Sequence, residues 1–352
     1  MDRAESLGQV TESRPIMISG VYRSGTTFLT AMLGAHPTIR AASSTVKFLR
    51  FCVGRYGDMD VRGNRHELVK DTDARIRKRW GLSLDVDGIV ARSDREARPS
   101  YALMYELIMR DLLCAGASLD VRWAEKLAVQ WEDIDRFLEM FPNGKAIHIF
   151  RDPRDVAVSY KLMTFEPGCT YLDAAFNFRG AAECIEGLVA KFPDRVLVVR
   201  AEDVAAEPEA NARRICAFLD IEYSPAMVDA RSLRADGEDW ASNTSFGKTY
   251  RALPDAKPRW PENLSRAEVM FIEMICQPYF SRLNYVTSGF LPSAEEWLEM
   301  HGFISDSFLS ERFSRWLSTG RGAQGYRTDP YEYEMKLVFP ERYGATSEAG
   351  AT

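Results

Sequence analysis

Residues 15–37 read PIMISGVYRSGTTFLTAMLGAHP, and this stretch decides the fold. The apolar run PIMISG is short and ends at a glycine, which predicts a buried strand that enters a tight turn. The residues that follow place Phe28, Leu29, Met32 and Leu33 at helical spacing, and the pattern stops at the final proline. We therefore expect a strand, a loop and a helix in direct succession.

The composition is typical of a globular protein with a substantial core. The chain has 352 residues, 46% hydrophobic and 27% charged, with a formal net charge of -6. This charge gives no general attraction to nucleic acids or anionic membranes, so we expect neither as a partner. No stretch reaches the roughly 18 apolar residues of a membrane span, and no integral membrane segment is expected. Six scattered cysteines and a polar beginning favour reduced thiols and a cytoplasmic location.

Further strands are predicted where short apolar runs recur. KAIHIF at 145–150 and RVLVVR at 195–200 are such runs, and helical patterns follow both. Alternation of strands and helices predicts an α/β fold, with a central, mostly parallel sheet flanked by helices on both faces. Ligands of such sheets bind at the carboxyl ends of the strands.

The domain boundaries follow from changes of pattern along the chain. Residues 1–14 are polar and are expected to form a flexible tail, and residues 15–285 are expected to form the main domain. Residues 40–100 lack a clean period and predict helical or irregular excursions rather than core sheet. Residues 286–352 predict extra C-terminal helices packed on the same domain.

The loop in the opening stretch resembles a Walker A loop without its lysine. The pattern GxxxxGK[ST] cradles phosphate, and its lysine reaches the outer phosphates. Here Gly20 and Gly25 keep the spacing, Thr26 replaces the lysine, and the positive charge lies within the loop at Arg23. A strand before and a helix after favour an anion site over a plain turn with a surface ion pair. The missing lysine makes a cleavable ATP or GTP a weaker prediction.

A second basic turn follows the strand at 145–150. In HIFRDPRDVAVSYK (148–161), Arg151 directly follows the strand and Ser159 lies eight residues later. A guanidinium and a hydroxyl can both bind phosphate oxygens. The alternative is an ion-pair cluster in which Asp152 and Asp155 neutralise the arginines. Together with the first loop, the pattern favours two anion holes on one rim of the sheet.

At these two motifs the sequence resembles the sulfotransferases that use 3′-phosphoadenosine 5′-phosphosulfate (PAPS). YRSGTTFL resembles their 5′-phosphosulfate loop, in the arginine form common in bacterial, carbohydrate and tyrosylprotein members, and FRDPRDVAVSY resembles their 3′-phosphate motif. Weaker similarities extend over residues 15–285. The resemblance implies the P-loop-like sulfotransferase fold. It implies 5′-phosphosulfate contacts from Arg23, Ser24, Gly25, Thr26 and Thr27, and 3′-phosphate contacts from Arg151, Ser159, Lys248 and Arg251.

The resemblance also implies a reaction. The sulfuryl group would be transferred in line and without a metal. The acceptor would be a hydroxyl group, in preference to an amine, of a small molecule, a carbohydrate or a lipid. The nucleotide product would be 3′-phosphoadenosine 5′-phosphate (PAP). Arg23 would stabilise the leaving phosphate, assisted by Lys126. Glu125 and His66 are candidate bases, although Glu125 could simply pair with Lys126 and His66 could be solvated. Ala201 stands where many relatives carry a tyrosine at the adenine contact.

Two other functions fit part of the pattern. A P-loop kinase of small molecules explains the first loop but not the missing lysine or the pairing of Arg151 with Ser159. A catalytically inactive nucleotide-binding protein fits the absence of an obvious base. A homodimer is retained as an option for the assembly.

Overall fold

The computed structural model describes residues 9–43, 46–161, 168–229, 257–323 and 330–343. The chain divides into two compact units. Unit 1 comprises Met1–Ser13, Thr45–Ser118 and Tyr326–Thr352, and unit 2 comprises Arg14–Ser44 and Leu119–Gly325. Unit 2 therefore contains the stretch from which the sequence analysis started.

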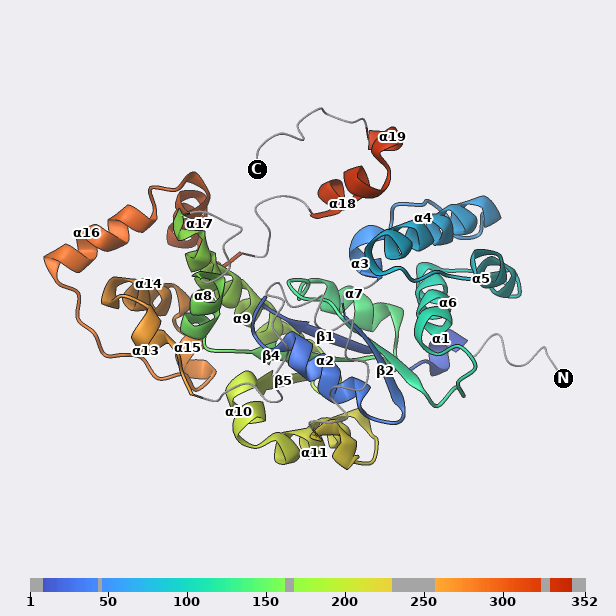
Figure 1. Cartoon of the computed structure of the whole chain (residues 1–352), viewed down its shortest axis with the longest axis horizontal. Coiled ribbons are helices and arrows are strands. Elements are labelled where there is room, and N and C mark those ends of the chain that lie inside the picture. The colour runs from blue at the N-terminus through green and yellow to red at the C-terminus, as the bar shows by residue number, and fades with distance from the viewer. Residues whose placement is uncertain (1–8, 44–45, 162–167, 230–256, 324–329, 344–352) are drawn as a thin grey trace. The chain divides into compact units, whose positions relative to one another are not determined.

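Unit 2 is built on a parallel sheet of five strands (Figure 1). The strands are β1 (Ile16–Gly20), β2 (Ile39–Ser43), β3 (Arg122–Lys126), β4 (Lys145–Phe150) and β5 (Val196–Arg200), in the order β2-β3-β1-β4-β5. All four pairings are parallel. β1 lies at the centre, with β3 and β4 beside it. Because these strands are parallel, their carboxyl ends lie together at one edge of the sheet.

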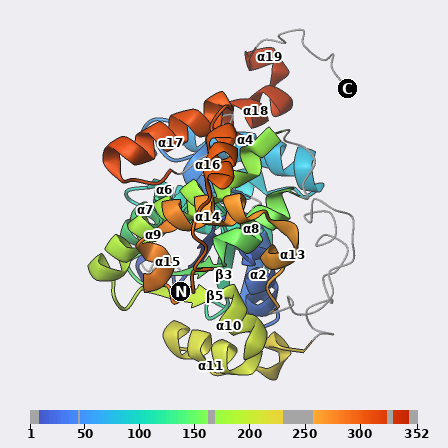
Figure 2. The ribbon, with the colours of Figure 1, turned by 90° about the vertical axis from the view of Figure 1, so that its left-hand side faces the viewer.

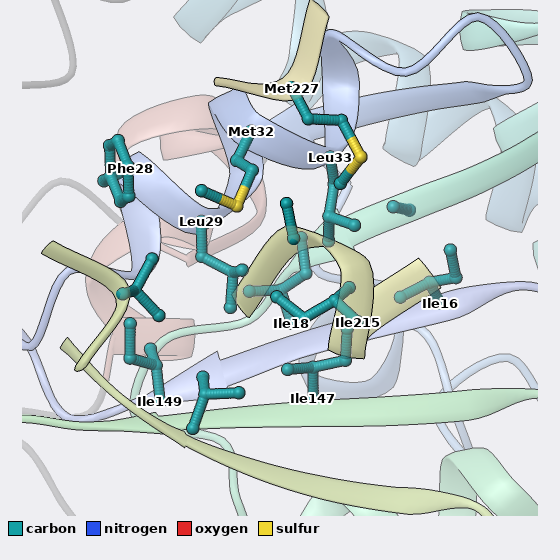
Figure 3. Close-up of a cluster of buried hydrophobic side chains, with 14 of the residues drawn as sticks. Ile16, Ile18, Phe28, Leu29, Met32, Leu33, Ile147, Ile149, Ile215 and Met227 are labelled. Atoms are coloured by element: carbon teal, nitrogen blue, oxygen red, sulfur yellow. The ribbon is translucent and has the colours of Figure 1, made fainter. Parts of the chain in front are cut away.

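One face of the sheet is covered by α2 (Thr26–Gly34), α10 (Ala201–Ala206) and α11 (Pro208–Leu219). Ile16 and Ile18 of β1 and Ile147 and Ile149 of β4 point into this layer and are fully buried. Figure 3 shows Phe28, Leu29, Met32 and Leu33 of α2 with Ile215 of α11 over these strands, joined by Met227 of the short helix η2 (Pro225–Met227). The predicted apolar positions of the first helix therefore form the core.

The opposite face packs against helices that come later in the chain. Trp123 meets Phe137 of α7 (Asp133–Met140), and Phe150 meets Phe178 of α9 (Asp173–Lys191). α14 (Arg266–Cys276) lies against both α8 (Pro153–Lys161) and α9 (Figure 2). The remaining short elements of unit 2 are η1 (Gly168–Leu172), α13 (Trp260–Asn263), α15 (Tyr279–Arg282), α16 (Ala294–Phe303) and α17 (Ser307–Thr319).

Unit 1 is helical in the part of it that the structure describes. Its helices are α1 (Gln9–Glu12), α3 (Phe48–Phe51), α4 (Arg62–Trp80), α5 (Val86–Ser93), α6 (Tyr101–Leu113), α18 (Pro330–Val338) and α19 (Pro340–Tyr343). Glu334 of α18 is buried and forms ion pairs with Arg75 and Arg79 of α4. The C-terminal helices are thus shared between the units, since α16 and α17 belong to unit 2.

The α/β class with a parallel central sheet, predicted from the sequence, is confirmed. The expectation that 40–100 contributes no core strand is wrong at its beginning, because β2 covers Ile39–Ser43. β3 was also not predicted. Its sequence RWAEK holds three charged residues although every position is buried, so it shows no apolar run. The buried Arg122 guanidinium donates a hydrogen bond to the Leu219 carbonyl, which offsets part of the cost of burying its charge.

Two further findings concern the whole described chain. Among its helices, none combines the length and the apolar character needed to cross a bilayer. Within the described ranges, five of the cysteines form no disulfide bond, namely Cys52, Cys114, Cys184, Cys216 and Cys276. The division into a tail, a main domain and an extension remains a prediction.

Candidate active site

The loop after β1, residues 20–27, here called the first loop, is closed by its own backbone. The Ser24 hydroxyl and amide both donate to the Val21 carbonyl, at 2.6 and 3.2 Å. Arg23 and Gly25 adopt left-handed conformations, with φ of 66° and 96°. A Cβ on Gly20 would lie 2.6 Å from Ser24 Oγ and 2.7 Å from the Ile149 carbonyl oxygen, so only glycine fits there. Ser24 therefore shapes the loop, and its hydroxyl is directed inward.

The first loop meets the turn after β4, residues 151–155, here called the RDPRD turn. Arg23 Nε donates to Ser159 Oγ at 2.9 Å, and Arg151 Nη1 donates to the Arg23 carbonyl oxygen at 3.3 Å. The two pairs come from motifs more than a hundred residues apart. They meet because β1 and β4 are neighbours in the sheet. The structure thus brings together the residues expected at the two separate anion sites.

A lysine reaches the first loop from the neighbouring strand. Lys126 ends β3, and its register partner on β1 is Ile18, so its side chain shares the face of α2. Lys126 Nζ donates to Thr27 Oγ1 at 3.1 Å. The cation that a Walker A loop carries at position Thr26 is therefore supplied here by a different strand.

Acidic groups hold the RDPRD turn in place, and two of them, Asp152 and Glu273, are buried. Glu202 Oε1, at the start of α10, accepts the Asp152 amide at 2.8 Å. Burial raises the pKa of the Glu202 carboxyl. Arg154 is almost fully buried, pairs with Asp152 and with Glu273, and stacks on the Trp260 ring with 4.0 Å to its centroid. The ion pairs proposed as the alternative for this turn do form, but they are internal supports rather than surface pairs.

Glu202 was not singled out from the sequence, and Asp155 was considered there only as a counter-ion of the arginines. Asp155 Oδ2 lies 3.5 Å from Arg151 Nη2, and Asp155 Oδ1 accepts the Arg259 and Trp260 amides. The available signal was weak: Glu202 lies two residues after the end of the strand predicted at 195–200, where ligand-site residues collect. The Asp152 amide lies 50 residues from Glu202, and the Arg259 and Trp260 amides lie more than a hundred residues from Asp155, so no local pattern marked these contacts.

The contacts described above do not include the other predicted residues. Glu125 is fully buried on the face of β3 opposite to Lys126, so the two adjacent side chains point to different layers. His66 lies in α4 of unit 1, half exposed, with Nε2 3.9 Å from the Asp87 carboxylate. Lys248 and Arg251 lie outside the described residues. The roles of all four remain predictions.

Two polar side chains lie beneath the loops with unusual surroundings. Ser19 and His148 are register partners on β1 and β4, both fully buried. Within the described part of the chain, Ser19 Oγ and both His148 ring nitrogens lack a hydrogen-bond partner. Burial lowers the pKa of His148 to about 3, so its ring is neutral near pH 7. His148 is therefore a buried core residue rather than a base of the site.

Comparison with known proteins places this site in a family. Residues 15–225 match the profile of the Sulfotransferase family. Protein-tyrosine sulfotransferase A of Caenorhabditis elegans is 25% identical over 284 residues, covering 77% of this chain and 67% of that protein. Protein-tyrosine sulfotransferase 1 of Danio rerio is 24% identical over 287 residues, covering 77% and 72%.

The fold is also found among solved structures. The sulfotransferase domain from the curacin biosynthetic pathway superposes with a TM-score of 0.52 at 18% identity, covering 78% of this chain and 98% of that domain. The match to the family profile covers more than half of the chain and includes both loops described above. The resemblance read from the two motifs is thereby confirmed, and the chain belongs to the sulfotransferase family of enzymes.

Proposed function

We propose that the protein transfers the sulfuryl group of PAPS to a small-molecule, carbohydrate or lipid acceptor. The accepting group is a hydroxyl in preference to an amine. The observation that carries this proposal is the Arg23 to Ser159 hydrogen bond of 2.9 Å, which unites the two expected phosphate sites at one edge of the sheet. A donor with a 5′-phosphosulfate and a separate 3′-phosphate suits two adjacent sites of this kind. A nucleoside triphosphate carries its charge in one chain of phosphates.

The first loop fits a phosphate group. α2 begins after Gly25, which has no side chain to cap the first amides of the helix. Such amides favour an anion, and the lack of room at Gly20 keeps the loop tightly curled. Arg23 and Lys126 add two cations, the second through its contact with Thr27. These residues suit the 5′ side of the donor.

The RDPRD turn fits the second phosphate. Arg151 presents a guanidinium two residues before α8 begins, and Ser159 lies within that helix. A planar fork of donors suits phosphate oxygens, and the hydroxyl adds one more donor. We assign Arg151 and Ser159 to the 3′-phosphate, with Lys248 and Arg251 as further candidates.

PAPS supplies an activated sulfuryl group, whose transfer leaves a phosphate with increased negative charge. Arg23, Lys126 and the amides at the start of α2 would stabilise that charge electrostatically. The acceptor must also lose a proton to a base. His66 and Glu125 remain the candidates, and Ala201 leaves the adenine contact to another residue.

Turnover with labelled donor tests the proposal. The purified protein is incubated with sulfur-labelled PAPS and a panel of sugars, phenols, lipids and tyrosine-containing peptides. The peptides are included because two relatives are named protein-tyrosine sulfotransferases. We expect transfer to at least one class without added metal. Binding of PAP without transfer to any class would favour an inactive nucleotide-binding protein.

Calorimetry separates the remaining alternative. We expect PAP to bind more tightly than ATP with Mg²⁺. Tight binding of ATP alone would favour a P-loop kinase instead. A cytoplasmic location and a homodimeric assembly stay predictions, which fractionation and light scattering can test.

A further inference from the structure

Asp155 lies where two parts of unit 2 meet. It is in the first turn of α8 and is almost fully buried. Its two carboxylate oxygens have different partners: Oδ2 lies 3.5 Å from Arg151 Nη2, while Oδ1 accepts the amides of Arg259 and Trp260 at 2.9 and 3.0 Å. One carboxylate therefore contacts both an expected phosphate ligand and the segment that leads into α13.

The segment of residues 257–264, here called the late segment, also contacts α8 through two other side chains. The Trp260 ring stacks on Arg154, and Lys161 Nζ donates to the Asn263 carbonyl at 3.4 Å. The Trp260 and Lys161 contacts are a ring stack and an exposed, long hydrogen bond. The Asp155 contacts are charge-assisted and buried, so they are expected to contribute more than these two contacts to holding the late segment.

The pairing with Arg151 has the geometry of a positioning contact. Arg151 also donates to the Arg23 carbonyl, so its guanidinium is held from two directions and keeps further N–H donors for a ligand. A guanidinium that is oriented before binding loses less conformational entropy when it meets a phosphate. Against this gain, the carboxylate places a negative charge near that phosphate. The two effects have opposite signs, and an experiment can tell which is larger.

We propose that Asp155 is a positioning residue that orients Arg151 toward the 3′-phosphate and fastens the late segment, so that phosphate binding and docking of that segment are coupled. This inference rests on the proposed function, because it takes the ligand of Arg151 to be the 3′-phosphate of the donor. Linkage requires that the coupling act in both directions. A ligand that stabilises the Arg151 pairing should therefore also stabilise the late segment.

Two substitutions separate the two contacts. Asp155→Asn keeps one carbonyl oxygen for the Arg259 and Trp260 amides and turns an NH₂ group toward Arg151. Asp155→Ala removes both contacts. Glu209→Gln is the matched control, because Glu209 in the same unit pairs with Arg213 at the surface, where both side chains are more than half exposed. If Asp155→Ala does not fold, Asp155→Glu replaces it, since the extra methylene displaces the carboxylate from both partners.

The first measurement is hydrogen exchange at the Arg259 and Trp260 amides without ligand. We expect faster exchange in Asp155→Ala, and exchange as in the native protein in Asp155→Asn and Glu209→Gln. In the native protein, saturating PAP should slow this exchange, and in Asp155→Asn it should not. Unchanged exchange in Asp155→Ala would overturn the anchoring of the late segment. An equal effect of PAP on the native protein and Asp155→Asn would overturn the coupling.

The second measurement compares the affinities for PAP and for adenosine 5′-phosphate, which lacks the 3′-phosphate. We expect both Asp155 variants to lose at least about tenfold for PAP, with the adenosine 5′-phosphate affinity unchanged within about twofold. Unchanged or tighter PAP binding in Asp155→Asn would overturn the positioning of Arg151. If the native protein does not bind PAP more tightly than adenosine 5′-phosphate, Arg151 does not bind the 3′-phosphate. That result would contradict this part of the proposed function and the positioning role of Asp155. Exchange in the ligand-free protein still decides the anchoring.

Discussion

Arg23 shows how a single residue changes the character of a phosphate loop. Its φ of 66° is unfavourable for a non-glycine residue, yet it directs the side chain toward Ser159 and the backbone carbonyl toward Arg151. A lysine in the Walker A position would come from the first turn of α2. Here the two cations come from within the loop and from β3, through Lys126.

Arg23→Ala should lower kcat by about a hundredfold or more, the size of effect seen when one preorganised donor to a developing charge is lost. The measurement is turnover of labelled PAPS with a saturating acceptor. Arg213→Ala is the control, because Arg213 forms an exposed pair on α11. Near-native kcat in Arg23→Ala would contradict the role of Arg23.

His148 predicts a pH dependence of stability. Its pKa is about 3 in the folded protein because of burial, against about 6.5 for an unperturbed histidine. Between these values the unfolded chain binds a proton that the folded protein does not. The native protein therefore loses stability through His148 as the pH falls from above 6.5 toward 3.

His148→Leu should remove this loss and also the unpaired ring nitrogens. We expect a Tm at least equal to that of the native protein at pH 7, and a Tm difference that grows in favour of the variant as the pH is lowered. Thermal unfolding at several pH values measures it. A difference that does not change with pH would show that His148 takes up a proton as readily in the folded protein as in the unfolded chain.

At the scale of elements, the first loop depends on close approach of backbone segments. A Cβ on Gly20 would collide with the Ile149 carbonyl of β4, which is backbone and cannot rotate away. Gly187, in α9, has nothing within 4 Å of the corresponding position. The same substitution therefore has opposite expected effects in the two elements.

Gly20→Ala should lower Tm and weaken PAP binding, because β1 and β4 must separate or the loop must open. Gly187→Ala should raise the stability by up to about 1 kcal/mol, through the higher helix propensity of alanine, and leave PAP binding unchanged. Calorimetry gives both quantities. Equal effects of the two substitutions would contradict the packing at Gly20.

At the scale of the whole molecule, the chain ends by completing unit 1. Glu334 of α18 is buried beside Arg75 and Arg79, and its carboxylate lies 4.0 Å from Lys47 Nζ. Arg75 is also held by the Val46 carbonyl and stacks on Phe51. Residues between positions 46 and 79 thus form one charged cluster with Glu334, which lies more than 250 residues later in the chain.

Glu334→Ala should destabilise unit 1 by about 3 kcal/mol or more, because it leaves the buried Arg75 guanidinium without its anion. Glu332→Ala, on the same helix, removes only an exposed pair with Lys336 and should change the stability by less than about 0.5 kcal/mol. Hydrogen exchange in α4 and α18 measures the effect. Equal exchange in the two variants would show that the Glu334 cluster adds little to stability.

The sequence by itself determined the elements that rest on local patterns. The strand at 16–20, the helix at 26–34 and the two basic turns follow from the apolar periodicity and the glycines, which depend on neighbours along the chain. The same patterns predicted the parallel sheet and the family. β3 was not predicted because RWAEK contains three charged residues and therefore shows no apolar run. These charges acquire their partners only in the folded protein.

Only the tertiary structure decided which charges meet. Lys126 reaches Thr27 across 99 residues, and Arg23 reaches Ser159 across 136. Asp155 joins Arg151 to the late segment, and Glu125 is turned to the face away from Lys126. These contacts follow from the strand order β2-β3-β1-β4-β5 and from the alternation of side chains across a strand. Hydrogen bonds and ion pairs act over a few ångströms in space, whereas the sequence displays only proximity along the chain.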